Sequence, residues 1–241
     1  MPYSLESLTQ QLLALPRRPL AIHTSYYKRG PGDYAESDRW LGIRNPDLRR
    51  LAIAFAGRLP LHQVEALLGS AYNEKRLLAL LLLVYHYRKA TPTQQQAIFD
   101  TYLHHKHRVN NWNLVDASAH HIVGAHLYQG DAGLLEMLDA SPHLWTRRIA
   151  MVATLYFIRH GQLEWTFRLA KKRLHDTHDL MHKATGWMLR EAGKKDVARL
   201  CAFLDSHTAQ MPRTMLRYAI ERLPQQQRKA YLAIPRGAIQ K

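Results

Sequence analysis

Apolar residues recur at helical spacing along most of the chain, and runs of alternating β-branched residues are nearly absent. Possible capping residues precede a proline at Asn45-Pro46 and Ser141-Pro142, and Thr91 with Gln94 has the spacing of a capping box. The pattern therefore predicts an all-α chain. The predicted helices cover residues 4–15, 46–57, 61–69, 74–88, 92–105, 111–128, 132–139, 142–160, 162–173, 177–193, 196–206, 212–222 and 224–233.

The predicted helices form pairs that recur about every 35 to 45 residues, a period typical of helical repeat proteins. Neighbouring pairs in such proteins bury each other's apolar faces, which predicts HEAT-like repeats in a curved α-solenoid. Periodicity alone leaves a compact all-α bundle open as an alternative. The long irregular stretch from Lys28 to Leu41 reads as an ordered functional loop more readily than as a linker. We therefore expect a single domain over residues 1–241.

The chain is strongly basic, with 34 Lys and Arg residues against 19 Asp and Glu residues and a formal net charge of +15. This excess is spread along the sequence and is densest after residue 200. A long basic surface suits the phosphate backbone of a nucleic acid, so we expect a concave basic groove. With 46% hydrophobic and 22% charged residues, the composition excludes a disordered or fibrous protein.

Cysteine content and hydropathy indicate the cellular compartment of the protein. The single cysteine, Cys201, excludes a disulfide scaffold and a thiolate zinc site, and it favours a reducing compartment. The apolar run Leu77–Tyr85 is about half the length of roughly 20 residues that spans a bilayer. The first residues show no basic leader followed by an apolar block. We expect a cytoplasmic protein that does not bind membranes.

The most unusual local sequence begins the predicted helix at residue 111. Trp112 and Asp116 are four residues apart and therefore share one helical face. Trp187 lies near Lys183 and Arg190, so an aromatic surface flanked by cations is predicted, as nucleotide contact requires. A core tryptophan with a paired aspartate, or a structural tryptophan with snorkelling arginines, would give the same spacing. The residues alone leave both interpretations open.

Five segments together resemble the DNA alkylation repair family of HEAT-like repeat DNA glycosylases (the AlkD type), from about Tyr26 to about Arg222. Their order and spacing both agree with that family. The segments are Tyr26-Tyr27-Lys28 with Gly32-Asp33-Tyr34, Leu41 to Asp47, Trp112 to Gly124, Trp145 to Arg148, and Lys183 to Glu191.

The resemblance implies a role for each matching residue. It implies that Asp116 is the catalytic carboxylate, that Trp112 and Trp187 contact the lesion nucleotide, and that Tyr26 or the adjoining Tyr27 lies near the lesion. It also implies that Arg148 contacts a DNA phosphate, and we predict Arg147, Lys183 and Arg190 as further phosphate-binding residues. The sequence has Asn113 where many members carry an acid and Asn111 where some carry a second aromatic residue. These departures concern the substrate range more than the reaction.

The implied reaction is hydrolysis of the N-glycosidic bond of N3- or N7-alkylated purines in duplex DNA, without base flipping. An alkylated purine is cationic and leaves as a neutral base, so positive charge develops on the deoxyribose and a carboxylate can stabilise it. We see no lysine nucleophile beside Asp116, which predicts a monofunctional enzyme. We expect a monomer that needs no cofactor and that is associated with the nucleoid through DNA binding.

The sequence also allows two other interpretations. His175, His178 and His182 have a spacing that could place them on one helical stripe, but no established zinc motif is present and we predict no metal site. The chain could also be a non-catalytic α-solenoid that binds damaged or branched DNA, because fold does not fix function. In that case Asp116 and Trp187 would not matter to its activity.

Overall fold

The computed structural model describes residues 3–237, and this part of the chain is helical and contains no β-strand. Contacts between Cα atoms divide the chain into two compact units, Met1–Ile122 and Val123–Lys241, and each unit is described by itself. The all-α class predicted from the spacing of apolar residues is confirmed.

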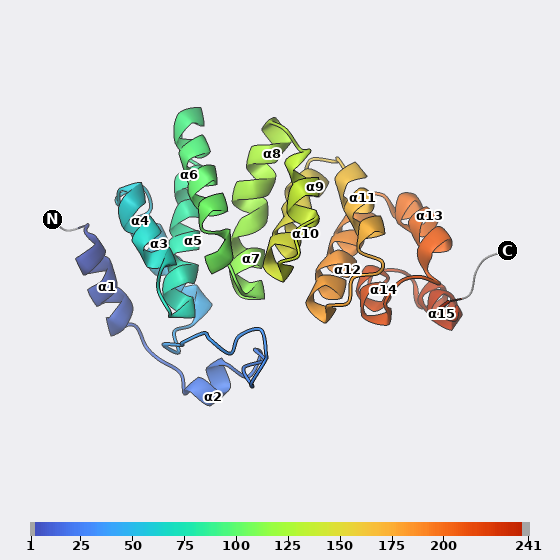
Figure 1. Cartoon of the computed structure of the whole chain (residues 1–241), viewed down its shortest axis with the longest axis horizontal. Helices are drawn as coiled ribbons and strands as arrows, with labels where there is room; N and C mark the ends of the chain where they lie inside the picture. The colour runs from blue at the N-terminus through green and yellow to red at the C-terminus, as the bar shows by residue number, and fades with distance from the viewer. Residues whose placement is uncertain (1–2, 238–241) are drawn as a thin grey trace. The chain divides into compact units, whose positions relative to one another are not determined.

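Unit 1 is built around α5 (Asn73–Tyr87), which packs against α3, α4, α6 and α7 (Figure 1). The other elements of this unit are α1 (Leu5–Ala14), α2 (Leu20–His23), α3 (Asn45–Phe55), α4 (Leu61–Leu68), α6 (Pro92–His104), a 3₁₀ helix (Lys106–Arg108) and α7 (Trp112–Ala119). Neighbours on every side bury all residues from Leu77 to Val84. The longest apolar run is thus a core helix, and none of the helices in residues 3–237 combines the length and hydropathy needed to cross a membrane.

Unit 2 repeats a pattern in which one long buried helix is covered by its sequence neighbours. The elements are α8 (Ala125–Gln129), α9 (Leu134–Asp139), α10 (Leu144–Arg159), α11 (Glu164–Lys172), α12 (Asp179–Gly193), α13 (Val197–His207), α14 (Arg213–Ala219) and α15 (Gln225–Ala233). α9 and α11 pack on α10, α13 and α14 pack on α12, and α10 packs directly on α12. Stacking of consecutive pairs is the arrangement expected of HEAT-like repeats.

Glycine allows the closest helix contacts. A Cβ atom on Gly186 in α12 would collide with the backbone oxygen of Met215 and the side chain of Tyr218, both in α14. Gly124 meets the backbone of Ala153 in the same way. Gly124 ends a π-helical turn, His120–Gly124, which interrupts the continuous helix predicted over residues 111–128. Single π-helical turns often lie at functional sites, and this one begins one turn after Asp116.

The capping predictions were partly right. Thr91 and Gln94 form the expected capping box at the start of α6. The predictions for Asn45 and Ser141 were wrong, because α3 and α10 begin after Arg44 and His143. Ser141 instead accepts a hydrogen bond from the backbone N–H of His143 at 3.2 Å and so holds the turn before α10. Asn45 is already the first residue of α3, and its side chain does not cap the helix.

Candidate functional site

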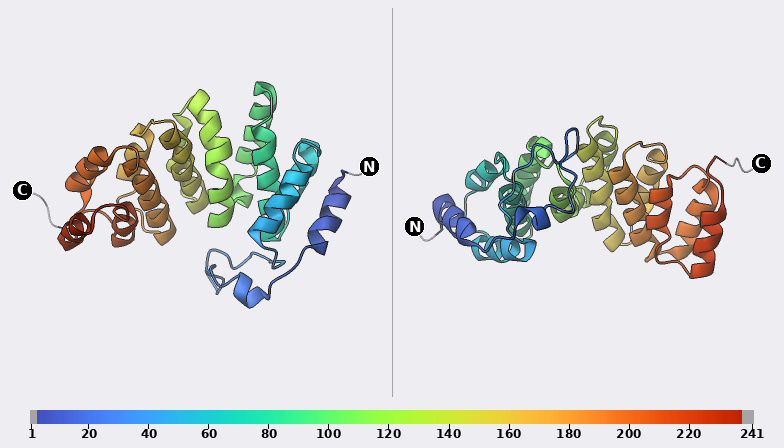
Figure 2. Two further views of the ribbon diagram at one scale, coloured as in Figure 1. Left: turned by 180° about the vertical axis from the view of Figure 1, so that it is seen from behind. Right: turned by 90° about the horizontal axis from the view of Figure 1, so that it is seen from below.

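The segment from α2 to the start of α3 is fixed to the beginning of α5 by Glu74. The Glu74 carboxylate accepts hydrogen bonds from the backbone N–H groups of Leu41 at 2.9 Å and Gly42 at 2.8 Å. His23 Nε2 lies 3.1 Å from the same carboxylate. Figure 2 shows this segment in two further views, beside the helices of unit 1. Glu74 therefore holds the C-terminal end of the predicted loop and the helix α2 that precedes the loop.

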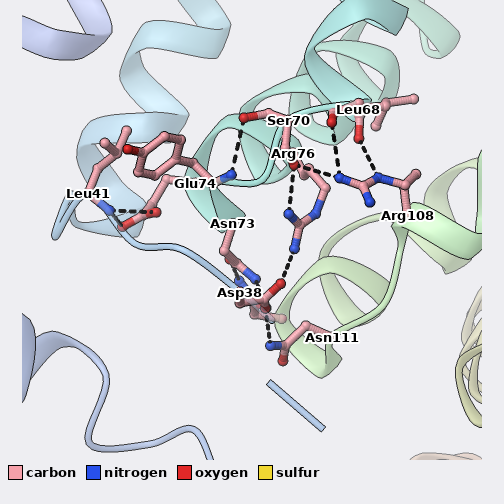
Figure 3. Close-up of polar contacts among 12 residues, drawn as sticks. Asp38, Leu41, Leu68, Ser70, Asn73, Glu74, Arg76, Arg108 and Asn111 are labelled. Atoms are coloured by element: carbon pink, nitrogen blue, oxygen red, sulfur yellow. Dashed lines mark hydrogen bonds and ion pairs between the residues drawn. The ribbon is translucent and has the colours of Figure 1, made fainter. Parts of the chain in front are cut away.

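A second buried acid, Asp38, joins the loop to two helices (Figure 3). Its carboxylate pairs with Arg76 and accepts hydrogen bonds from Asn73 Nδ2 at 3.0 Å and Asn111 Nδ2 at 2.8 Å. We call these four residues the Asp38 cluster. The side chains of Asp38 and Arg76 are each only 2% exposed. Because Asn111 directly precedes Trp112, the cluster fixes the start of α7 against the loop and α5.

The two asparagines on either side of Trp112 are structural in this chain. Asn111 donates to Asp38, and Asn113 donates from Nδ2 to Asn73 Oδ1 at 2.7 Å. Both asparagines are buried. A carboxylate in place of Asn113 would bring a further buried negative charge toward the Asp38 cluster, which costs free energy unless it is paired. Asn111 and Asn113, which differ from the residues that other members of the resembled family carry there, thus fit the hydrogen bonds that this chain offers them.

Trp112 is held between tyrosines. Its Nε1 atom donates to the Tyr34 hydroxyl at 3.2 Å, and the Tyr27 ring stacks on the indole with ring centres 5.1 Å apart and an interplanar angle of 19°. Tyr27 also contacts Trp40, with ring centres 4.2 Å apart. Burial, together with the negative charge of Glu74, raises the pKa of Tyr27, so the phenol stays neutral.

The structure separates the two tyrosines that the sequence left as alternatives. Tyr27 lies against Trp112, whereas Tyr26 is 78% exposed. Tyr27 is therefore positioned by the same elements that position Trp112. A lesion contact by either tyrosine stays a prediction.

Trp112 and Asp116 line one pocket of unit 1, as their spacing of four residues predicts. The pocket has a volume of about 200 Å³, and α3, α5 and α7 form its walls. It is lined by Asn45, Arg49, Leu77, Leu81, Trp112, Asn113, Asp116 and Ala117. We call it the Asp116 pocket. It brings a half-buried carboxylate, an indole and a guanidinium around one small space. Asn45 was predicted only as a helix cap within the matching segment Leu41 to Asp47, and Arg49 was missed because it stands outside every segment singled out in the sequence.

In unit 2, the predicted lesion and phosphate residues of α12 are half-buried. Trp187 follows Lys183 by one turn, and Lys183 Nζ lies 2.7 Å from Asp179 Oδ2. Arg190 pairs with Glu221 and lies 3.3 Å from Glu191. An anion that binds to Lys183 or Arg190 must therefore share these side chains with their carboxylate partners. Phosphate binding by the two residues stays a prediction.

The side chains of Arg148 and Arg147 donate hydrogen bonds to backbone oxygens. Arg148 is 4% exposed and donates to the backbone oxygen of Leu180, which ties α10 to the start of α12. Arg147 donates to the backbone oxygen of Pro142 at 2.7 Å and to Asp176 at 3.0 Å. Little of the Arg148 guanidinium is left to meet a phosphate. A phosphate contact by either arginine stays a prediction.

Arg173 links Asp176 to a buried carboxyl group, Asp139, at the end of α9. Arg173 Nε lies 3.2 Å from Asp139 Oδ1, but within residues 3–237 neither oxygen of Asp139 accepts a hydrogen bond. Burial raises the pKa of Asp139 to about 6, against the opposing charge of Arg173.

This raised pKa predicts a pH dependence of stability. The native state favours the protonated form of Asp139. The stability that the protonated carboxyl group contributes to the folded protein is therefore complete below about pH 4 and is lost as the pH rises through 6. Replacement by Asn removes the titration. The difference in unfolding free energy between wild type and Asp139→Asn should therefore shift against wild type by about 2 kcal/mol from pH 4 to pH 7. Urea unfolding of both proteins at several pH values measures it, and parallel pH profiles would contradict the prediction.

Two of the three histidines considered for a metal, His178 and His182, have other partners. His178 Nδ1 accepts a hydrogen bond from the backbone N–H of Leu180 at 3.1 Å and caps α12. His182 Nε2 is hydrogen-bonded to the backbone oxygen of Asp176. In the described part of the chain, no group of three or more His, Cys, Asp or Glu side chains is arranged to hold a metal ion.

The chain is similar to a known protein family and to a solved structure. Residues 10–223 match the family described as DNA alkylation repair enzyme. A solved structure titled predicted DNA alkylation repair enzyme from Enterococcus faecalis has a similar fold, with a TM-score of 0.67 and 16% sequence identity. The match covers 88% of this chain and 99% of that one. No curated protein matches the sequence.

Proposed function

Because the chain belongs to the family of DNA alkylation repair enzymes, we propose that it is a monofunctional DNA glycosylase for positively charged N3- and N7-alkylpurines in duplex DNA. Family membership makes DNA its partner and repair its role. The observation that carries the finer proposal is the Asp116 pocket, where a carboxylate and the indole of Trp112 line one small space.

The chemistry of these two groups suits a cationic substrate. Cleavage of the glycosidic bond releases a neutral base and leaves positive charge on the deoxyribose. An ion pair at about 4 Å in an effective dielectric near 20 is worth roughly 4 kcal/mol. Since each 1.36 kcal/mol or so is tenfold in rate, Asp116 contributes about a thousandfold. The carboxylate also orients the attacking water, and the face of Trp112 attracts the cationic sugar or base.

The size and lining of the pocket support two further parts of the proposal. Its volume of about 200 Å³ is below the roughly 300 to 1,000 Å³ of pockets that enclose small ligands, so it suits the edge of a sugar better than an extruded purine nucleotide. Among the described residues that line it there is no lysine. A lysine amine is what a strand-cleaving glycosylase uses to form a Schiff base. We therefore propose excision without base flipping, which leaves an abasic site in an intact strand.

Unit 2 contributes DNA contacts in this proposal. Trp187 supplies a second aromatic face for the lesion nucleotide, and Lys183, Arg190 and Arg147 supply positive charge toward phosphates, whereas buried Arg148 holds the start of α12 in place. The net charge of +15 strengthens binding along the DNA backbone whatever its sequence. Duplex DNA is therefore bound over a longer surface than the Asp116 pocket, and the pocket acts on the one nucleotide that carries the lesion.

Binding of a transition-state analogue tests the role of Asp116 directly. We expect wild type to bind a duplex with a cationic pyrrolidine in place of the deoxyribose more tightly than one with an uncharged tetrahydrofuran, because an enzyme is complementary to its transition state. In Asp116→Asn this preference should largely disappear, while affinity for the tetrahydrofuran duplex stays the same. Fluorescence anisotropy measures both. An equal preference in the two proteins would show that Asp116 does not face the sugar.

A further inference from the structure

We propose that Arg49 and Asn45 form a binding subsite for a DNA phosphate, which takes the phosphodiester next to the lesion nucleotide. The inference rests on the proposed function, because it says which group of the DNA lies opposite Asp116. Arg49 and Asn45 are four residues apart on α3 and both line the Asp116 pocket. They face it from a different helix than Asp116, which stands on α7.

The partners of the neighbouring arginines single out Arg49. Arg44 and Arg50 both pair with the buried carboxylate of Asp47, with Arg44 Nε 2.7 Å from Asp47 Oδ2. Over residues 3–237, Arg49 forms no ion pair, and its side chain is exposed. The structure therefore holds two of the three arginines in place and leaves the third at the pocket edge with its positive charge available.

Asn45 offers a second donor at the same edge. Its amide does not cap α3, since Arg44 occupies the cap position and no side-chain capping bond is formed there. A guanidinium presents several N–H donors in a planar fork that matches phosphate oxygens, and an amide adds one more neutral donor. Together they form a site for an oxyanion, while a cationic alkylated base would be repelled by Arg49.

The charges around the pocket match the charges of one nucleotide in DNA. During base release the sugar becomes positive, and the phosphates attached to it are negative. Asp116 suits the sugar and Arg49 suits a phosphate. A bound phosphate also cancels the charge of Arg49, which would otherwise oppose positive charge on the sugar. The subsite therefore sets the register of the DNA strand so that the sugar of the lesion lies at Asp116.

Neutral phosphate linkages test the subsite without requiring catalysis. The probe is a duplex with an uncharged tetrahydrofuran at the lesion position, in which the phosphodiester on one side or the other is replaced by a neutral methylphosphonate. Wild type, Arg49→Ala and Arg50→Ala are compared, and Arg50 is the matched control because it neighbours Arg49 but pairs with Asp47.

We expect one of the two replacements to weaken binding by wild type and by Arg50→Ala about tenfold, as loss of a charge-assisted hydrogen bond does. Arg49→Ala should bind the unmodified probe about tenfold more weakly and should be insensitive to the same replacement. Its salt dependence should be shallower by about 0.9 in the logarithmic slope. Equal sensitivity in Arg49→Ala and wild type, or wild-type affinity in Arg49→Ala, would overturn the subsite.

This experiment separates the subsite from the proposed function. It measures binding to a probe that has no base to release. Coupling between Arg49 and one phosphodiester in a protein that releases no alkylated base would support the subsite and contradict the glycosylase. Base release by wild type without such coupling would support the glycosylase and contradict the subsite.

Discussion

Asp116→Asn should lower the single-turnover rate of alkylpurine excision about a thousandfold. The substitution keeps the shape of the side chain and removes the charge that stabilises the cationic sugar. Because the carboxylate acts on charge that appears only in the transition state, affinity for the substrate duplex should change little. Excision under saturating enzyme measures the rate, and anisotropy measures the affinity.

The matched control for this variant is Asp100→Asn. Asp100 is an exposed carboxylate of α6 that accepts a hydrogen bond from Gln96 and lies outside the Asp116 pocket. It should excise at the wild-type rate. A wild-type rate in Asp116→Asn would remove Asp116 from the reaction. An equal loss in both variants would mean that overall charge, and not the pocket, sets the rate.

Asp38→Ala should destabilise the protein by about 3 to 5 kcal/mol, because it leaves the buried guanidinium of Arg76 without its ion-pair partner. It also removes the acceptor for Asn73 and Asn111, so the start of α7 loses its anchor to the loop. Urea unfolding followed by circular dichroism measures the loss. Excision should fall as well, since Trp112 directly follows Asn111.

Two further variants distinguish a buried charge from an ordinary ion pair. Glu164→Ala breaks the ion pair with Arg199, in which the Glu164 side chain is 67% exposed and the Arg199 side chain is 40% exposed. This variant should lower the free energy of unfolding by less than about 1 kcal/mol. The double variant Asp38→Leu with Arg76→Met should recover much of the stability lost in Asp38→Ala, because no unpaired charge remains buried. A double variant as unstable as Asp38→Ala would show that packing, and not charge, dominates at this position.

The sequence predicted those parts of the site that depend on local spacing. Trp112 and Asp116 share a pocket because residues four apart on one helix must lie on one face. The capping box at Thr91 is a local pattern of the same kind, and it too was correctly predicted. Most helix positions were likewise predicted, since buried faces repeat at the helical period.

What the sequence could not predict depends on contacts between distant residues. Asp38, Arg76 and Asn111 meet only after the loop folds onto α5 and α7, and the helical period does not say which partner a buried charge will find. Arg49 and Arg50 look alike in the sequence. Only the fold shows that Arg50 pairs with Asp47 whereas Arg49 lines the Asp116 pocket.

The most direct test of the proposed glycosylase activity is release of free base from duplex DNA that contains 7-methylguanine, with wild type and Asp116→Asn assayed side by side. Wild type should release 7-methylguanine and leave an abasic site in an uncut strand, and Asp116→Asn should release almost none. DNA binding without base release by wild type, on this duplex and on duplexes with 3-methyladenine or bulky cationic adducts, would contradict it and favour a DNA-binding protein without glycosylase activity.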